Sequence, residues 1–374
     1  MLEAQFGDKA IYSHKANSSF GIPFHILGLN RKSFKVFEWV VFFFKAPFQV
    51  YAPFPKQEIY IVEADCDRTG EGKFLATLLR PHITLWVSSS RTHSMNIVMK
   101  LRESIEDATA REFSEFARYT RELVVANGDV LSIVSSLEGI SARKIFVRES
   151  ECLSKFSVNE SSTEFVIGST VYKIPFLVPK DVVRSIVMTE IVCKEHDVSI
   201  DTDFLKLVLP AGRSSIFSGT KNRLLMDSTY NTSLESARSI LEVFALHPRI
   251  PKWIVLGDML ELGEFEEEEH VRLASIIEKY YFERVILVGP RLRKSTYPKL
   301  LESLYYKDRV ITFLGPNEAW KYIESESNGG EAMLFKGARF LEGIVEKLLL
   351  NSSDVDNLPR RERMWNARRK KWKI

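Results

Sequence analysis

The sequence predicts an α/β protein in which two domains with mostly parallel sheets follow one another. Strand-like apolar runs alternate with helix-like polar segments over most of the 374 residues, as in sheets whose strands are joined by crossover helices. The alternation restarts after residues 209–212, where Pro210 and Gly212 interrupt it. A composition of 45% hydrophobic and 27% charged residues is ordinary for a globular chain of this length. The expected parts are residues 1–208, residues 209–352 and a basic tail over residues 353–374.

The first domain is expected to place its first clear strand at residue 58. EIYIVEAD (58–65) and HITLWVSS (82–89) have the apolar character of strands. Helices are predicted near residues 70–79 and, with a longer polar sequence, over about residues 101–124. The β-like runs KIFVRES and STEFVIG follow without a helical period, and a last helix is expected over residues 180–196.

The second domain shows the alternation more clearly. Its strand-like runs are LLMD, WIVLG, RVILVG, RVITFLG and AMLFKG. Strands that alternate in this way with helices predict a Rossmann-like sheet with helices on both faces. The helix-like segments begin near residues 233, 266, 296, 317 and 340.

The cysteines, the net charge and the start of the chain bound the class of protein. Cys66, Cys152 and Cys193 are odd in number and far apart, so neither a disulfide framework nor a structural zinc site is expected. The formal net charge of +3 is small, and we expect no nucleic-acid partner. The first 15 residues lack the continuous apolar core of a secretory signal, which favours a cytoplasmic protein.

One apolar segment and one basic segment differ from the rest of the chain. FKVFEWVVFFFKAPF (34–48) contains charged residues and ends well short of the roughly 20 apolar residues that span a bilayer. We expect a buried or groove-covering helix there, with a helix on a membrane surface as the alternative. RRERMWNARRKKWK (360–373) could meet phosphate or acidic lipid, but we expect a solvated tail and assign it no function.

Three motifs of the second domain lie where a predicted strand gives way to a turn or helix. They are DSTYN (227–231), WIVLGDMLELGE (253–264) and KGARFLE (336–342). Open α/β sheets gather their ligand-binding residues at such strand ends. In their residues and in their order along the chain, the motifs resemble the C-terminal domain of the Mur ligases, the ATP-dependent enzymes that build peptidoglycan precursors. The first domain resembles the family's central domain more weakly.

The resemblance implies an ATP-dependent ligase that joins an acid to an amino acid. Mur ligases phosphorylate a carboxylate with ATP, and an amine then displaces phosphate from the acyl phosphate. This chemistry requires Mg²⁺ and positive charge that faces the transferred phosphoryl group. The motifs are most similar to those of members that add D-alanyl-D-alanine to a UDP-muramoyl peptide. The implied cofactors are therefore ATP and Mg²⁺, and the implied substrates are that peptide and a D-amino-acid dipeptide.

The resemblance also implies roles for residues of the second domain. Arg213 matches a G-R pair whose guanidinium reaches the nucleotide phosphates, a bidentate task that suits arginine. Asp227, Tyr230 and Asn231 match a D-x-x-Y-N segment that lies near ribose and adenine. The other matching residues are implied to bind the amine substrate or the phosphates, and they are Asp258, Glu261, Lys336 and Arg339.

In the first domain the resemblance points to a magnesium site. Glu63 matches the leading glutamate of an E-x-G-x-x-x-x-G-E segment, and His93 matches the histidine of an N-I-x-x-x-H segment. Asn17 belongs to a segment that resembles N-x-N-x-x-x-G-x-P and is implied to bind substrate. From the residues alone, a carboxylate that ends a buried strand is more often functional than structural, and a helix cap or salt bridge is the alternative for Glu63.

Two departures from the family leave two hypotheses for activity. No G-x-x-x-x-G-K-[ST] occurs, so the family's P-loop and UDP-binding domain are expected to be missing from this chain. Where many members carry a carbamylated lysine, this chain offers Ala110 and Arg111, and an arginine stays protonated. The first hypothesis is an active ligase. The second is a catalytically inactive relative that serves as a binding or scaffold module.

Overall fold

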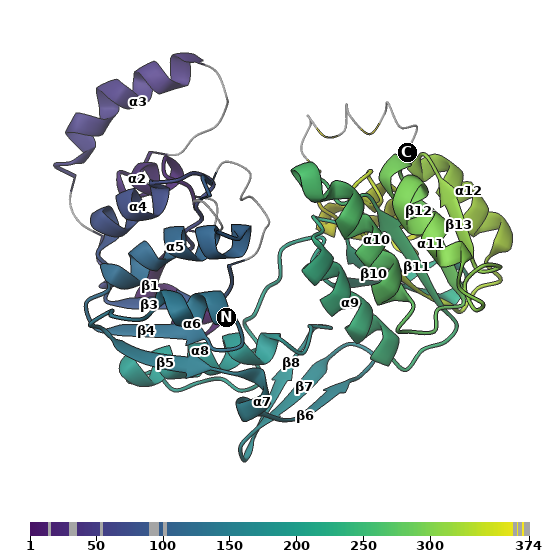
Figure 1. Ribbon diagram of the computed structural model, residues 1–374, viewed down its shortest axis with the longest axis horizontal. Coiled ribbons are helices and arrows are strands. Elements are labelled where there is room, and N and C mark those ends of the chain that lie inside the picture. The colour runs from purple at the N-terminus through teal and green to yellow at the C-terminus, as the bar shows by residue number, and fades with distance from the viewer. Residues whose placement is uncertain are drawn as a thin grey trace. The chain divides into compact units, whose positions relative to one another are not determined.

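The structure is a computed structural model that describes residues 1–13, 16–29, 36–52, 55–89, 97–99, 103–361, 365 and 369. The chain divides into two compact units (Figure 1). Unit 1 comprises Met1–Cys152 and Arg184–Asp201, and unit 2 comprises Leu153–Val183 and Thr202–Ile374. Within the described ranges, no helix is long and apolar enough to cross a membrane.

The described residues of unit 1 form two small parallel sheets. β1 pairs with β2, while β4 lies between β3 and β5. Every residue of β4 is buried, and its run Leu-Val-Val-Ala is the continuous apolar sequence that a strand covered on both faces needs. The strands are β1 (Ala10–Ser13), β2 (Ile59–Val62), β3 (Ile83–Trp86), β4 (Leu123–Asn127) and β5 (Arg143–Val147).

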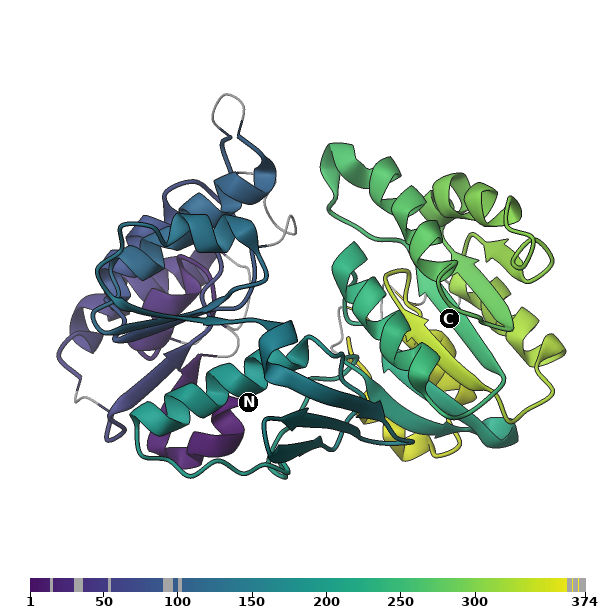
Figure 2. The same cartoon turned by 60° about the horizontal axis from the view of Figure 1, so that its bottom comes forward.

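The helices of unit 1 come from distant parts of the sequence. α8 returns after the small sheet of unit 2 and lies beside α1 (Figure 2), where the ring centroids of Phe6 and His196 are 5.8 Å apart. Phe6 also shares a buried cluster with Val192 and Cys193. The helices are α1 (Leu2–Phe6), α2 (Gly21–Ile26), α3 (Val36–Gln49), α4 (Glu71–Leu79), α5 (Ile105–Arg118), α6 (Leu131–Ser136), α7 (Glu149–Cys152) and α8 (Val182–Glu195).

The long helix expected over residues 101–124 is shorter at both ends. α5 begins after Ser104, whose Oγ accepts a hydrogen bond from the N–H of Asp107 at 3.1 Å and caps the helix. At the other end, Val124 and Val125 belong to β4 and not to the helix. The prediction was wrong there because β-branched residues fit a buried strand better than the end of a polar helix.

The phenylalanine-rich helix α3 buries only one of its sides. Trp39 and Phe42 pack against Phe24 of α2, with ring centroids 5.5 and 5.1 Å apart. Four other rings of the helix are between 73% and 77% exposed. The expectation of a buried helix is therefore wrong for one side of α3, since α2 contacts only the other side. The exposed rings belong to Phe37, Phe43, Phe44 and Phe48.

Unit 2 contains the predicted Rossmann-like sheet, which follows a small antiparallel sheet of β6 (Leu153–Val158), β7 (Thr163–Ile167) and β8 (Thr170–Ile174). The large sheet has the order β13-β12-β11-β14-β10-β9. All neighbouring strands in it are parallel except β9 and β10. Its strands are β9 (Ser215–Gly219), β10 (Arg223–Ser228), β11 (Lys252–Gly257), β12 (Arg284–Val288), β13 (Val310–Phe313) and β14 (Ala332–Lys336).

Helices cover both faces of the large sheet. On one face, α9, α10 and α11 form a core with Ile254 and Val285. On the other face, α12 and α13 form a second core with Trp253 and Val255. Neighbouring residues of β11 thus point to opposite faces of the sheet. Helices on both faces of a mostly parallel sheet confirm the predicted α/β class. The helices are α9 (Leu234–Leu246), α10 (Glu266–Ile277), α11 (Tyr297–Leu301), α12 (Pro316–Glu326) and α13 (Glu342–Leu348).

The start of α9 sets the shape of the turn after β10. Ser236 donates its N–H to Ser233 Oγ at 3.2 Å, and Ser233 donates its N–H to Ser236 Oγ at 2.9 Å. The capping residue Ser233 thus lies two residues after the D-x-x-Y-N segment, and α9 begins directly after it. Short 3₁₀ turns at Gly7–Lys9, Thr220–Asn222, Gly263–Phe265 and Ser352–Asn357 and a π turn at Leu292–Thr296 complete the elements.

Candidate functional site

The three motifs of unit 2 meet at one edge of the large sheet. β14 lies between β10 and β11, and Lys336 at its end is in register with Ser228 of β10 and Leu256 of β11. The three strands are parallel, so their carboxyl ends emerge at the same edge. We call this place the motif edge, formed by residues 227–231, 257–261 and 336–339. Such an edge is where open α/β sheets bind ligands.

Asp227 is a fully buried carboxylate near the end of β10. Its Oδ1 accepts a hydrogen bond from the N–H of Thr229 at 2.9 Å. Its Oδ2 is buried too, and it has no hydrogen-bond partner among the residues that the structure describes. Burial raises the pKa of this carboxyl, while Thr229 and Arg360 oppose the shift. Asp227 therefore keeps an unfilled acceptor at the motif edge.

Lys336 ends β14 and is only 7% exposed. Its Nζ donates to the backbone carbonyl of Asn231 at 2.7 Å. Burial and the nearby charge of Arg213 lower its pKa to about 8, and Asp227 acts in the opposite direction. In the described part of the chain, Lys336 forms no salt bridge with a carboxylate. A bound anion would therefore relieve the cost of this buried cation.

Arg213 and Tyr230 form the exposed part of the motif edge. The Arg213 guanidinium lies over the Tyr230 ring, 5.1 Å from its centroid. Tyr230 is 48% exposed, and it donates its N–H to the carbonyl of Gly212 at 3.2 Å. Among the described residues, Arg213, like Lys336, has no carboxylate partner. An exposed aromatic ring beside two unpaired cations suits a planar base and a phosphate group.

Arg360, which we expected in a solvated tail, also lies at the motif edge. Its guanidinium donates to the carbonyl oxygens of Thr229 at 3.0 Å and Tyr230 at 2.6 Å. It also donates to Oε2 of the buried Glu342 at 3.2 Å. Burial raises the pKa of the Glu342 carboxyl, and Arg360 opposes that shift. The expectation was wrong for Arg360, because a run of basic residues does not reveal which arginine folds back onto the domain.

Asp258, directly after β11, is the second buried carboxylate of the motif edge. Its Oδ1 accepts backbone N–H groups from Arg291 at 3.2 Å and Leu292 at 3.1 Å. Its Oδ2 accepts Nε and Nη2 of Arg339 at 2.9 and 2.7 Å. Both oxygens are thus satisfied, and Asp258 ties the ends of β11, β12 and β14 together. Substrate binding by Asp258 and Arg339 stays a prediction.

Two glycines allow the ends of β11 and β14 to approach each other. A Cβ atom at Gly257 would lie 2.0 Å from the carbonyl oxygen of Ala338. Gly337 has a φ of 115°, and a Cβ there would lie 2.5 Å from the carbonyl oxygen of Gly257. Gly257 is thus required by space and Gly337 by both space and backbone conformation. Glu261, in the next loop, is exposed with a φ of 62°, and its role in substrate binding also stays a prediction.

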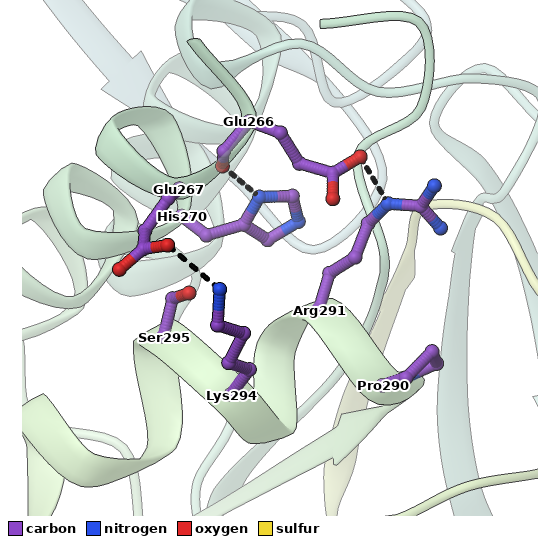
Figure 3. A pocket seen from close by; sticks show the side chains of 7 residues that line it. All are labelled: Glu266, Glu267, His270, Pro290, Arg291, Lys294 and Ser295. Carbon is purple, nitrogen blue, oxygen red and sulfur yellow. Dashed lines mark hydrogen bonds and ion pairs between the residues drawn. The ribbon is translucent and has the colours of Figure 1, made fainter. Parts of the chain in front are cut away.

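A polar pocket of about 450 Å³ lies beside Arg291 at the start of α10 (Figure 3). Lys294 Nζ lies 2.7 Å from Glu267 Oε2, and Arg291 is paired with Glu266. His270 is hydrogen-bonded through Nδ1 to the carbonyl of Glu266 at 2.6 Å. Cations and carboxylates neutralise each other here, so this pocket is a weaker anion site than the motif edge. Its lining residues are Glu266, Glu267, His270, Pro290, Arg291, Lys294 and Ser295.

The structure describes only part of the predicted magnesium site in unit 1. Glu63 follows β2 directly, but it is exposed and β2 is only partly buried, so the premise that it ends a buried strand is wrong. The carbonyl of Asn17 accepts the N–H of Asp65 at 2.8 Å, which places Asn17 beside the same loop. His93 lies outside the described residues. Among those described, no three His, Cys, Asp or Glu side chains are grouped for a metal ion.

The segment around residue 111 has structural partners of its own. Glu112 Oε1 accepts the N–H groups of Gly70 and Gly72, each at 2.8 Å, and so satisfies the N-terminus of α4. Arg111 donates to Glu103 at 2.9 Å and to the carbonyl of Val98 at 2.9 Å. Glu112 thus holds α5 against the start of α4, and Arg111 holds the segment that precedes α5. The sequence offered no signal for the contacts of Glu112, since Gly70 and Gly72 are distant from it in the chain.

Known sequences match the second half of this chain most clearly. Residues 212–339 match the family described as Mur ligase, glutamate ligase domain. The UDP-N-acetylmuramoyl-tripeptide--D-alanyl-D-alanine ligase of Rickettsia prowazekii (strain Madrid E) is 26% identical over 300 residues, which cover 75% of this chain and 64% of that protein. The ligase of the same name from Bacillus subtilis (strain 168) is 30% identical over 128 residues, covering 33% of this chain and 28% of that protein. The chain thus spans less than two thirds of these curated relatives.

Solved structures share the fold over most of the chain. MurF from Acinetobacter baumannii has a TM-score of 0.72 at 17% identity and covers 93% of this chain, which corresponds to 72% of that protein. MurF ligase from Thermotoga maritima in complex with ADP has a TM-score of 0.68 at 17% identity, with 92% of this chain and 74% of that protein covered. At these identities the likeness concerns the fold alone. The chain thus shares a Mur ligase domain model over residues 212–339 and the MurF fold over most of its length.

Proposed function

We propose that this chain takes part in an ATP-dependent ligation that adds D-alanyl-D-alanine to a UDP-muramoyl peptide during peptidoglycan precursor synthesis. One observation carries the proposal. Within the described residues, Arg213 and Lys336 lack carboxylate partners at the motif edge, whereas nearby Arg291 and Arg339 are paired. Two unpaired cations at the carboxyl edge of a Rossmann-like sheet suit the phosphates of a nucleotide.

The neighbouring groups fit the rest of a nucleotide. Tyr230 offers an exposed ring for a base, and Arg213 already lies over that ring. Asp227 has an acceptor oxygen without a partner in the described part of the chain, which suits a sugar hydroxyl. Arg360 holds the turn that carries Tyr230 and therefore positions the base site.

ATP supplies the phosphoryl group that activates a substrate carboxylate when it is bound. In this proposal Arg213 and Lys336 bind the phosphates, and they stabilise the negative charge that develops there during phosphoryl transfer. With a pKa of about 8, Lys336 is mostly protonated at neutral pH. A bound phosphate would stabilise the protonated lysine further, and the protonated lysine would in turn favour phosphate binding. Glu63, exposed directly after β2, is the carboxylate we propose as a magnesium ligand together with His93.

Titration calorimetry of the 374-residue chain with ADP tests the nucleotide site. We expect Lys336→Met and Arg213→Met each to weaken ADP binding at least tenfold, because each removes an unpaired cation. Lys294→Met is the matched control, since that lysine is exposed and already paired with Glu267. ADP binding that is unchanged in both motif-edge variants, or lost equally in the control, would contradict the proposal.

A second function is an inactive relative that binds nucleotide or peptide without ligation. Its specific support is Arg111, which stands where the resemblance expects a lysine and is bonded to Glu103 and Val98. The two functions differ in turnover. Mass spectrometry of a mixture of chain, ATP, Mg²⁺, UDP-muramoyl tripeptide and D-alanyl-D-alanine detects the ligated product for the first function. ADP binding without that product favours the second.

A further inference from the structure

Helix α3 carries an apolar stripe that the rest of unit 1 leaves exposed. With 3.6 residues per turn, its exposed apolar side chains fall within an arc of about 140°. Trp39 and Phe42 lie outside that arc and pack on Phe24. Figure 1 shows α3 at the outer end of unit 1, beyond α2 and α4. The stripe consists of Phe37, Val40, Phe43, Phe44, Pro47 and Phe48.

The exposed apolar surface continues past the helix. Val50 and Tyr51, directly after α3, are 65% and 88% exposed. On the side of α2, Phe20 packs edge-on against Trp39 and is still 57% exposed. Contiguous apolar surface of this kind is rare on soluble proteins and marks a site of interaction.

The charge around the stripe indicates what kind of surface it meets. The segment between α2 and β2, residues 27–58, contains five basic and two acidic residues, a balance of +3 that equals the formal net charge of the whole chain. No charged residue interrupts the stripe itself, and Lys45 of α3 is exposed beside it. An apolar aromatic stripe, on a segment whose sequence has an excess of basic residues, suits a bilayer surface with apolar chains below negatively charged headgroups.

The length of α3 limits how it could meet a bilayer. Its 14 residues extend for about 21 Å at 1.5 Å per residue, less than the roughly 30 Å of a hydrocarbon core. A helix of this length with one apolar side lies in the plane of the interface. Pairing with a second copy is less favourable, because a symmetric contact through the stripe would bring two positively charged segments together.

We propose that α3 docks this protein onto the surface of an anionic phospholipid bilayer, with the Phe37–Phe48 stripe inserted among the lipids. This inference is independent of the proposed ligase function. It requires only that the stripe be accessible and that the excess positive charge of residues 27–58 attract anionic headgroups.

Vesicle flotation of the full 374-residue chain tests the docking. With vesicles of phosphatidylglycerol and phosphatidylcholine, we expect the protein to float, and with phosphatidylcholine alone we expect at least tenfold less protein to float. The variant Phe37→Ser/Phe44→Ser/Phe48→Ser should lose at least tenfold of its binding to anionic vesicles. All three side chains are exposed, so the variant should keep its circular dichroism and melting temperature.

The matched control changes three equally exposed apolar residues elsewhere, as Leu131→Ser/Leu205→Ser/Leu304→Ser. Their exposures are 84%, 77% and 88%, and this variant should float like the original chain. Lys45→Glu should weaken flotation with anionic vesicles. The proposal is overturned if the original chain does not float, if the phenylalanine variant floats equally well, or if both triple variants lose flotation alike. A dimer that only the phenylalanine variant abolishes, without flotation, would assign the stripe to self-association.

Discussion

Two buried aspartates at the same sheet edge differ in how many hydrogen bonds their carboxylates accept. Asp258 directly follows β11 and Asp227 lies near the end of β10, on either side of β14, and both are fully buried. Asp258 accepts four N–H groups, two from backbone and two from Arg339. Asp227 accepts one backbone N–H through Oδ1, and its Oδ2 has no partner in the described part of the chain.

The difference separates a structural carboxylate from one that is available to a ligand. The donors to Asp258 come from the turn after β12 and from Arg339 after β14, so its charge holds these two strand ends at the motif edge. The environment of Asp227 instead raises its pKa, which shows that its charged form is poorly compensated. Burial alone therefore does not reveal the role of a carboxylate, whereas its hydrogen-bond count does.

The largest expected effect comes from removing the satisfied carboxylate. Asp258→Ala leaves Arg339 and two backbone N–H groups without their acceptor, which should lower the free energy of unfolding by about 4 kcal/mol. Urea denaturation at pH 7 measures this change. Glu267→Ala is the control, because the exposed pair with Lys294 should contribute no measurable stability. If Asp258→Ala were as stable as the Glu267→Ala control, Asp258 would not be a structural carboxylate, and its contrast with Asp227 would be wrong.

The second expected effect concerns the close approach of Gly257, at the end of β11, to the backbone of Ala338 after β14. Gly257→Ala would place a methyl group 2.0 Å from the carbonyl oxygen of Ala338, so the strand ends must move apart. We expect a loss of about 3 kcal/mol in the free energy of unfolding. Gly330→Ala is the matched control, since its φ of 86° is also unfavourable but no atom lies within 4 Å of the added Cβ. Its loss should be about 1 kcal/mol. A similar loss in both variants would show that the strand ends are not tightly packed.

The third prediction concerns Lys336 and the dependence of stability on pH. Its pKa is lowered from 10.5 to about 8 in the folded chain, so the unfolded chain binds more protons between these values. Stability should therefore rise as pH increases from 8 to 10.5, by at most about 3 kcal/mol. Lys336→Met should abolish that rise, while Lys294→Met should retain it. The measurement is the urea midpoint of each variant at pH 7.5 and pH 10. A rise that persists in Lys336→Met would assign it to another group.

Much of unit 2 could be predicted from sequence because its signals are local. Alternating apolar runs and helix-like segments predicted the sheet, and motifs at strand ends predicted the positions of Asp227 and Lys336. Parallel strands then bring those ends together without further information. The prediction did not extend to hydrogen-bond partners. Nothing in the sequence around Asp258 or Asp227 indicates that one carboxylate is saturated and the other is not.

The features that could not be predicted depend on contacts between distant residues. Arg360 looked like part of a solvated basic run, and its role appears only because the chain folds back onto Glu342 and the carbonyl of Tyr230. Glu63 was expected at the end of a buried strand, but among the described strands β2 pairs with β1 alone, and Glu63 is exposed. The apolar segment 34–48 was expected to form a buried or groove-covering helix, yet the segment alone does not show which side of α3 has a partner.

The smallest expected effect on stability comes from the unsatisfied aspartate. A carboxyl whose pKa is raised by folding stabilises the folded chain below its unfolded value of 3.8, and that contribution is lost as pH rises through the folded pKa. Asp227→Asn removes the charge at similar size, so its stability should change by only about 1 kcal/mol at pH 7 and in the favourable direction. Urea midpoints at pH 4 and pH 7 should show the variant gaining relative to the original chain as pH rises. A strong destabilisation at pH 7, comparable with that of Asp258→Ala, would mean that Asp227 also serves to hold the edge together.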